Sequence, residues 1–396
     1  MNATTSRRLV LGLAVTIAVA GLSPAAGAGP SRDRDRSEAP LRKVIRRHIA
    51  PGLIFTKIVQ KKIPLRTYIL RADVRTTPLT MDVALGGSAM PQRDRTSRIA
   101  NRHGAIAAVN GDFGTFSGGP THPFEEDGTL VRSSISPGFM FAVSKDEQQM
   151  FVQRPVQWMS ATLPSGLVWP IARWNDGPPG TGEITANTPV GGSLEPPPPG
   201  ACSARLLPSG SPEPSSTGDG MQQSFTVDVT GCFEDGLARN GGVVLSAIPA
   251  SDEALQLLSL APGTPVMLRW TFGWTNVYDA MGGVPQLVAD GRNVAGSCSG
   301  SICNRNPRTG VGITADGRVI MVVVDGRQSK WSVGLTMNQF GRLMVRLGAV
   351  SALNLDGGGS STMVIRGKVV NRPSAGFERR VTNALLVLPG PDFDEP

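Results

Sequence analysis

Residues 350–361 read VSALNLDGGGSS, an apolar strand that runs directly into a carboxylate, three glycines and two serines. Because glycine has no Cβ, a ligand can approach its backbone closely, and successive N–H groups can converge on one oxygen. The stretch therefore predicts a loop that binds a phosphate or sugar oxygen beside Asp356, with donors from Gly357, Gly358, Gly359, Ser360 and Ser361. The plainer alternative is a glycine-rich turn in which Asp356 only accepts hydrogen bonds from nearby N–H groups.

No lysine follows the three glycines, and residues 362–365 read as another strand. A nucleoside-triphosphate-binding loop needs that lysine and a helix after the glycines, so this class of site is disfavoured. A second strand end has the same character, since the apolar run 105–109 leads into Asn110, Gly111 and Asp112. Functional side chains often sit where strands end, so both ends are candidate parts of a site.

Apolar and β-branched runs bounded by glycine and proline predict strands through most of the chain. Glycine (48) and proline (32) make 80 of the 396 residues, which favours short strands over a helical bundle. Helices are expected only at 94–103, 252–259 and 336–348, the last opened by a Thr336–Gln339 capping box. The fold class is therefore predicted as α+β, with mixed β-sheets and a few short helices, and the length alone allows two domains or one large one. The expected strands are 53–60, 64–71, 80–86, 105–109, 138–143, 150–157, 224–230, 243–248, 265–273, 285–290, 311–314, 319–324, 350–355, 362–365 and 383–388.

The N-terminus predicts export. Residues 1–28 combine two arginines, an apolar run and a small-residue cleavage site, which is typical of a signal peptide. Residues 29–50 read as a basic tether that could associate with the cell envelope, and residues 391–396 as a tail. The expected location is therefore secreted or envelope-associated, outside the cytoplasm.

The net charge of +8 is concentrated in the same region. Residues 1–50 hold nine basic and three acidic residues, a net +6, so residues 51–396 carry only +2. A nearly neutral body argues against nucleic acid as a partner.

Four cysteines in an exported chain predict two disulfides, and neighbour pairing, Cys202 with Cys232 and Cys298 with Cys303, is the simplest arrangement. The first pair lies near a Pro/Gly/Ser-rich stretch at about 175–220 that predicts a long loop. The alternative for this stretch is a linker between two domains.

Arginines accompany the two strand ends. Arg308 precedes a strand, Asp325 and Arg327 end one, and Glu378 and Arg379 lie in a loop before the last strand. The arginine fork suits phosphate oxygens, although each arginine could instead form a surface ion pair. A serine–histidine–aspartate hydrolase with His103 or His122 as the base is also compatible with the composition.

In this order the motifs resemble the phosphodiester glycosidase domain family over roughly residues 60–390. The matching segments are 104–113, 127–128, 290–291, 306–312, 324–327, 347–349, 354–361 and 378–379. Because they flank the stretch 175–220 on both sides, the resemblance implies a single large domain over 51–390 into which this stretch is inserted. The resemblance implies hydrolysis of a phosphodiester-linked sugar at its anomeric carbon, giving free sugar and a phosphomonoester.

The resemblance also suggests roles for the residues. Asp112 and Asp356 would stabilise the cationic transition state or activate water, and Glu378 would be a third carboxylate. Arg308, Arg327 and Arg379 would hold the phosphate, while Asn110 and Ser360 would orient the sugar. No cofactor is required, although clustered aspartates could hold a divalent cation. The rival functions are a non-catalytic glycan-binding protein of the envelope and a phosphodiesterase that cleaves P–O.

Overall fold

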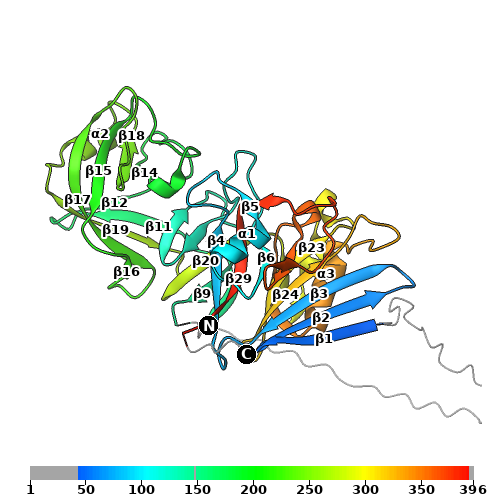
Figure 1. Cartoon of the computed structure of the whole chain (residues 1–396). Helices are drawn as coiled ribbons and strands as arrows, with labels where there is room; N and C mark the ends of the chain where they lie inside the picture. The colour runs from blue at the N-terminus through cyan, green and yellow to red at the C-terminus, as the bar shows by residue number, and fades with distance from the viewer. Residues whose placement is uncertain (1–42, 147–148, 392–396) are drawn as a thin grey trace, which may run out of the picture. The chain divides into compact units, whose positions relative to one another are not determined.

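The apolar run that leads to the three glycines forms the strand β25, as predicted, inside an eight-stranded sheet (Figure 1). The computed structural model describes residues 43–146 and 149–391. The predicted signal peptide, residues 29–42 of the tether and residues 392–396 of the tail lie outside the described residues. In order across the sheet, the strands are β1 (Lys43–Ala50), β2 (Leu53–Gln60), β3 (Leu65–Ala72), β24 (Val319–Val324), β23 (Arg308–Thr314), β25 (Ala349–Asn354), β21 (Gln286–Ala289) and β22 (Arg292–Asn293).

A five-stranded sheet packs against one face of the eight-stranded sheet. The shared core includes Leu70 and Met321 from the first sheet and Val83, Val109 and Leu385 from the second. The strands of the second sheet, in order, are β27 (Lys368–Val369), β26 (Met363–Ile365), β6 (Ala107–Asn110), β29 (Asn383–Pro389) and β4 (Leu79–Leu85).

Each sheet has a helix on its outer face. Helix α3 (Met337–Arg346) opens with the predicted capping box and packs Phe340 and Met344 on the eight-stranded sheet. Helix α1 (Thr96–Arg102) packs Ile99 and Ala100 on the five-stranded sheet. The core is thus built from two sheets between two helices.

Three further sheets complete the described chain. One has the order β10 (Met150–Gln153), β9 (Phe139–Ser144), β20 (Val277–Gly283), β7 (Phe124–Glu126) and β8 (Thr129–Arg132). A nine-stranded sheet carries helix α2 (Asp252–Leu258) and contains β12 (Val168–Pro170), β11 (Trp158–Thr162), β19 (Pro265–Thr271), β17 (Met221–Cys232), β15 (Cys202–Pro208), β18 (Val243–Ala247), β14 (Thr185–Asn187), β13 (Arg173–Trp174) and β16 (Glu213–Pro214). The last is the pair β28 (Arg380–Val381) and β5 (Asp94–Arg95). Sheets with three short α-helices confirm the α+β prediction, and the described residues form one compact unit.

Two predictions about irregular segments were wrong in part. Residues 43–50, expected as tether, form the edge strand β1, whose backbone pairs with β2 while basic side chains point outward, a common feature of edges. The stretch 175–220, expected as a loop, contains β14, β15 and β16. Its composition misled because the buried residues of β15 are mostly small, namely Cys202, Ser203 and Ala204 beside Leu206, and because the strand gains its pairing from β17 and β18, which lie later in the sequence.

Both disulfides are paired as predicted. Cys202 and Cys232 face each other in the register of β15 and β17. Cys298 and Cys303 close a short loop in front of β23. Among the described helices, none combines the length and the apolar character needed to cross a membrane.

The topology brings six strand termini to one place. Arg308 pairs with Val324 and Gly310 with Asn354, so the start of β23 lies beside the ends of β24 and β25. In the other sheet Met363 pairs with Val109, and Ala384 with Asn110, so the end of β6 lies beside the starts of β26 and β29. The N–H of Asp356 donates to Gly111 O at 2.9 Å and joins the two groups of termini.

Glu125 on β7 gives a test of this packing. It is buried, accepts a hydrogen bond from the Trp270 indole at 3.1 Å, and burial raises its pKa from 4.5 to about 8. A carboxyl whose pKa is raised on folding contributes stability at acid pH that is lost as the pH rises from 4.5 through 8. We expect Glu125→Gln, which cannot ionise, to gain melting temperature relative to the natural chain as the pH is raised from about 5 to about 9.

Differential scanning fluorimetry at the two pH values measures this gain, with the exposed Glu234→Gln as the matched control. If the melting temperatures of Glu125→Gln and the natural chain differ by the same amount at both pH values, this would contradict a buried, protonated Glu125.

Candidate functional site

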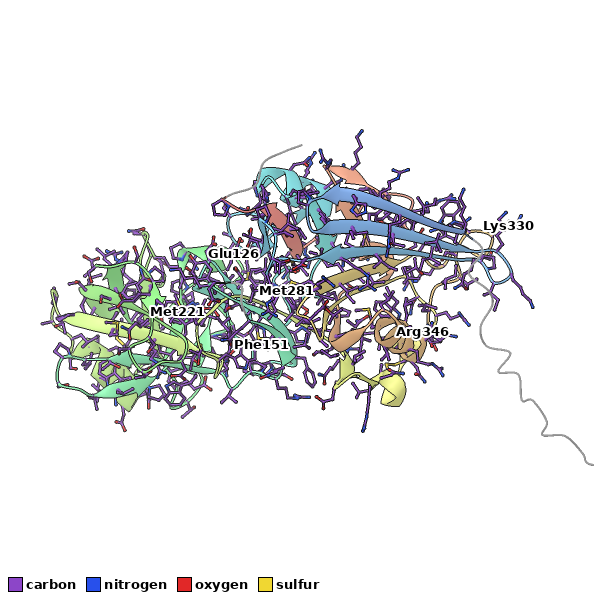
Figure 2. The ribbon with its side chains drawn as sticks, turned by 90° about the horizontal axis from the view of Figure 1, so that it is seen from below. Glu126, Phe151, Met221, Met281, Lys330 and Arg346 are labelled. Carbon is purple, nitrogen blue, oxygen red and sulfur yellow. A yellow bond between two sulfur atoms is a disulfide. The ribbon has the colours of Figure 1, made fainter. Side chains whose placement is uncertain are left out.

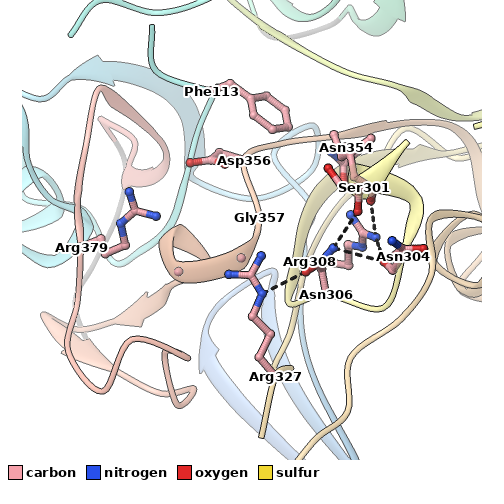
Figure 3. A pocket seen from close by; sticks show the side chains of 13 residues that line it. Phe113, Ser301, Asn304, Asn306, Arg308, Arg327, Asn354, Asp356, Gly357 and Arg379 are labelled. Atoms are coloured by element: carbon pink, nitrogen blue, oxygen red, sulfur yellow. Dashed lines mark hydrogen bonds between the residues drawn. The ribbon is translucent and has the colours of Figure 1, made fainter. Parts of the chain in front are cut away.

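A cavity of about 520 Å³ opens where the strand termini meet (Figure 3). It lies between the glycine loop, the three arginines predicted for phosphate and the loop closed by the second disulfide. Its lining residues are Phe113, Ser301, Ile302, Asn304, Asn306, Arg308, Arg327, Asn354, Asp356, Gly357, Gly358, Gly359 and Arg379. The structure therefore brings together Asp356, the three glycines and the three arginines.

Each glycine of the loop is required by a close neighbour. A Cβ on Gly357 would lie 2.8 Å from Pro307 O, and one on Gly359 would lie 2.6 Å from Arg379 Cδ. At Gly358, which has a positive φ of 61°, a Cβ would lie 3.2 Å from both terminal nitrogens of Arg327. The absence of side chains thus lets two guanidinium groups lie against the loop.

The three arginines differ in how they are held. Arg308 is buried and donates through Nε to Leu335 O (3.0 Å) and through Nη2 to Ile302 O (2.6 Å). Arg327 is exposed and donates through Nε to Asn306 Oδ1 at 3.0 Å. Arg379 is exposed, and Figure 3 shows it across the glycine loop from Arg327.

None of these guanidinium groups has a carboxylate within 4.0 Å in the part of the chain that the structure describes. Burial, and secondarily the charge of Arg327, lower the pKa of Arg308 to about 10, so it is still cationic at neutral pH. Buried or clustered charges normally have a counter-ion. The cavity is therefore a positively charged site suited to an anion such as phosphate.

Asp356 is the one carboxylate that lines the cavity. Burial raises its pKa, and the negative charge of Asp112 adds to this, whereas the Ser360 hydroxyl, Arg379 and the Gly357 N–H act in the opposite direction. A carboxylate with a raised pKa can accept a proton from water near neutral pH.

Asp112 does not line the cavity and its side chain is fully buried. Its carboxylate accepts from the N–H of Phe113 (2.6 Å) and the N–H of His122 (2.9 Å), and Oδ1 lies 2.7 Å from His122 Nδ1. This arrangement holds Phe113, which lines the cavity, and orients the buried His122 ring. Asp112 thus acts on the site through its neighbours and its charge.

Asn110 also lies beneath the cavity. Its Oδ1 accepts from Thr309 Oγ1 (2.8 Å) and from the N–H of Thr362 (3.0 Å), while Nδ2 donates to Asp356 O (2.7 Å). The side chain is fully buried, so its geometry favours positioning of Asp356 over direct contact with a sugar.

Asp325 has a similar position at the end of β24. Its buried carboxylate accepts from Tyr68 Oη (2.9 Å), Trp331 Nε1 (2.8 Å), Asn371 Nδ2 (3.1 Å) and the N–H of Arg372 (3.0 Å). These bonds fix the turn that carries Arg327, two residues later. Asp325 does not line the cavity wall.

The remaining predicted residues also lie outside the cavity wall. Glu378 accepts from the N–H and the hydroxyl of Ser97, at 2.7 and 2.6 Å, and so satisfies donors in the first turn of α1. Ser360 and Ser361 are buried behind the glycines. His103 lies 3.9 Å from Asp82, not at the cavity.

Several wall residues were not predicted from the sequence. Ser301, Ile302 and Asn304 come from the loop that the Cys298–Cys303 disulfide closes, and the nearness of this loop to the Arg308 motif was the available signal. Asn354 is buried, donates through Nδ2 to Val284 O at 2.6 Å, and has no hydrogen-bond partner for Oδ1 among the described residues.

A trio of carboxylates could hold a metal ion elsewhere. The ligand atoms of Asp82, Asp127 and Asp279 lie within 4.8 Å of one another, and burial raises the pKa of Asp82 to about 6. None of the three lines the cavity with the arginines. The chemistry at that cavity is accordingly derived from its own side chains.

Comparison with known proteins confirms the resemblance to the phosphodiester glycosidase family. The family model described as "Phosphodiester glycosidase" matches residues 218–388, which include Arg308, Arg327, Asp356 and Arg379. Over 142 residues the chain is 28% identical to N-acetylglucosamine-1-phosphodiester alpha-N-acetylglucosaminidase of Mus musculus, covering 35% of this chain and 26% of that protein. Over 91 residues it is 37% identical to the SPbeta prophage-derived uncharacterized protein YomE of Bacillus subtilis, covering 23% of this chain and 14% of that protein.

Solved structures share the fold. A hypothetical protein from Synechocystis superposes with a TM-score of 0.65 at 20% identity, covering 89% of this chain and 64% of that one. A putative exported protein from Burkholderia pseudomallei superposes with a TM-score of 0.58 at 23% identity, covering 82% of this chain and 74% of that one. The aligned segments thus span about a quarter or less of the two curated relatives, and most of the two structures.

Gly359→Ala tests the packing of the loop. The three atoms nearest to the new methyl group all belong to the Arg379 side chain, so the substitution should displace that side chain, and phosphate should bind about tenfold more weakly through the loss of one charge-assisted hydrogen bond. Calorimetric titration with inorganic phosphate measures this loss. Gly210→Ala is the matched control, because its Cβ would have no neighbour closer than 3.8 Å. Phosphate binding that is equal in both variants would refute the close packing of Arg379 on the loop.

Proposed function

We propose that this chain is an exported hydrolase that cleaves a sugar-1-phosphodiester at the anomeric C–O bond. The observation that carries the proposal is the set of three guanidinium groups around one cavity, unpaired by any described carboxylate, beside the single carboxylate of Asp356. The family match over residues 218–388 supports the same reaction class. The mouse relative, whose name states an N-acetylglucosamine-1-phosphodiester substrate, supports this sugar as the first to test.

The reaction breaks the bond between the anomeric carbon and the phosphate oxygen. The bonding electron pair leaves with the phosphate, an oxocarbenium-like cation develops on the sugar, and the oxygen of water bonds to the anomeric carbon. The proton of that water passes to the Asp356 carboxylate. A phosphomonoester is already a stable leaving group, so no carboxylic acid is needed to protonate it.

Arg308, Arg327 and Arg379 stabilise the charge that gathers on the leaving phosphate. Preorganised donors of this kind lower the barrier because they need not reorient during the reaction. Gly358 and Gly359 keep the loop thin enough for two of the guanidinium groups to reach the phosphate.

Four predicted site residues do not line the cavity and act through their neighbours: Asp112, Asn110, Asp325 and Glu378. In this proposal Asn110 fixes the backbone of Asp356, and Asp325 fixes the turn of Arg327. Asp112 raises the proton affinity of Asp356 through its charge. Glu378 anchors the segment next to Arg379 on helix α1.

An extracytoplasmic location is supported by the two disulfides, which form and persist in oxidising compartments. The N-terminal signal pattern of residues 1–28 supports the same location. Association with the envelope through the basic N-terminal segment stays a proposal.

The non-catalytic glycan-binding alternative makes a different prediction for Asp356. A binding protein should retain the sugar-1-phosphodiester and release no reducing sugar, with or without this carboxylate. The arrangement of Asp356 inside the ring of arginines supports catalysis, because a carboxylate next to a bound phosphate would only weaken simple binding.

Asp356→Asn should lower kcat for an N-acetylglucosamine-1-phosphodiester by at least about 100-fold, the usual contribution of a general base. Its melting temperature should stay close to that of the natural chain, because burial already disfavours the charged form of Asp356. Release of reducing sugar and scanning calorimetry measure the two quantities. Asp235→Asn, at an exposed position, controls for loss of a charge. A large loss of stability would instead indicate that Asp356 has a structural role.

Arg327→Lys keeps the charge but removes the planar fork, so KM for the phosphodiester should rise about tenfold. The inhibition constant of a neutral methyl glycoside of the same sugar should not change, because it has no phosphate to hold. Steady-state kinetics with both compounds measure this, and the exposed Arg342→Lys on α3 is the control. Equal losses for the charged and the neutral compound would argue against phosphate binding by Arg327.

A further inference from the structure

A basic surface lies next to the cavity and is not used by the proposed reaction. Residues 43–72, which form β1, β2 and β3, contain eight lysines and arginines and no aspartate or glutamate. Figure 2 shows Lys330 at the tips of these strands, and the N–H of Val333 donates to Pro64 O at 2.9 Å in the turn between β2 and β3. The segment around Trp331 therefore packs on the basic strands.

Three cations converge on the indole of Trp331. The Arg66 guanidinium lies 3.6 Å from its ring centroid, that of Arg372 5.2 Å, and Lys57 Nζ 6.0 Å. Arg66 also donates to Trp331 O. We call these four residues the Trp331 cluster. Cation–π contacts offset part of the repulsion between like charges that gather in this way.

The Trp331 cluster has an uncompensated positive charge. In the described ranges no carboxylate lies within 4.0 Å of Lys57, Arg66 or Arg372. The nearby carboxylate of Asp325 is buried and already accepts four hydrogen bonds. The three cations therefore have one nearby acid, whose oxygens are already occupied. Lys57 and Arg66 are half-buried and Arg372 is exposed, so their charged groups can bind an anion from solution.

A short segment connects the Trp331 cluster to the cavity. The N–H of Arg372 donates to Asp325, and the Ser374 hydroxyl donates to Gly358 O at 3.4 Å in the glycine loop. Gln328, next to Arg327, donates to Arg372 O at 3.1 Å. The cluster and the phosphate-binding arginines thus flank the same stretch of backbone.

We propose that the Trp331 cluster is a second phosphate subsite and that the substrate is a polymer of repeating sugar phosphates. This inference rests on the proposed function of the cavity. One phosphodiester lies among Arg308, Arg327 and Arg379, and a further phosphate of the same chain binds Lys57, Arg66 and Arg372. The preferred substrate is therefore an extended anionic glycan and not a single sugar phosphodiester.

The test uses the full chain and two substrates with the same linkage, a single sugar-1-phosphodiester and an oligomer of several such repeats. Lys57→Gln with Arg372→Gln removes two charges and leaves the Arg66–Trp331 contact intact. Arg292→Gln with Arg342→Gln removes the same charge from exposed positions of β22 and α3, which pack on each other away from the Trp331 cluster. The kinetic constants of both variants and of the natural chain are measured at low and high salt.

We expect the Lys57/Arg372 variant to lose about tenfold in kcat/KM for the oligomer and to keep that for the single phosphodiester within about twofold. The preference of the natural chain for the oligomer should shrink at high salt, because exposed charges are screened. Equal losses on both substrates, or the same loss in the Arg292/Arg342 variant, would overturn the proposal. Equal turnover of oligomer and single phosphodiester by the natural chain would also overturn it.

A binding experiment separates this proposal from that for the cavity. If neither compound is hydrolysed, the proposed function fails, but the subsite still predicts that the oligomer binds more tightly than the single phosphodiester and that the Lys57/Arg372 variant loses the difference. Sedimentation with vesicles of anionic phospholipid tests whether the Trp331 cluster binds a membrane surface instead. Loss of vesicle binding in that variant, with oligomer binding unchanged, would assign the cluster to a membrane surface and refute the polymer.

Discussion

The close approach of three glycines to their neighbours is the constraint on which the candidate site depends. Pro307 O, Arg327 and Arg379 occupy the space that Cβ atoms on Gly357, Gly358 and Gly359 would need. A side chain at Gly358 or Gly359 would displace Arg327 or Arg379 from the loop, and one at Gly357 would collide with Pro307 O. The stretch 356–361 therefore shapes the cavity mainly through the absence of side chains on its glycines. Its carboxylate, Asp356, is the one negatively charged group in the cavity wall.

Buried polar side chains keep this thin loop in place. Asn110 connects the end of β6 to Thr309, Thr362 and Asp356, and Asp325 connects β24 to β3 and to residues 371–372. Such networks are costly when a partner is missing, so they define one arrangement of the strand ends. The two packed sheets supply the rigid frame, and the polar residues between their edges set the position of the arginines.

The sequence predicted local features well. The capping box and apolar stripe of α3 and the runs of β23, β24 and β25 depend on neighbours in the chain, and all were confirmed. The glycine stretch leaves β25 as a loop, and its binding of an anion stays a prediction. The roles of Asn110 and Asp325 could not be predicted, because their partners lie 199 and 257 residues away. The same reason explains β15, whose pairing comes from later strands, and the wall formed by the loop at 298–303, whose position depends on the buried contacts of Arg308.

The bond that water attacks is the most direct test of the central claim. Hydrolysis of an N-acetylglucosamine-1-phosphodiester in ¹⁸O-labelled water, followed by mass spectrometry of both products, shows which product receives the oxygen. The ring of arginines around the departing phosphate predicts the label in the sugar, since the C–O bond breaks and the phosphate keeps its own oxygens. Label in the phosphate would contradict this account and would make the chain a phosphodiesterase that cleaves P–O.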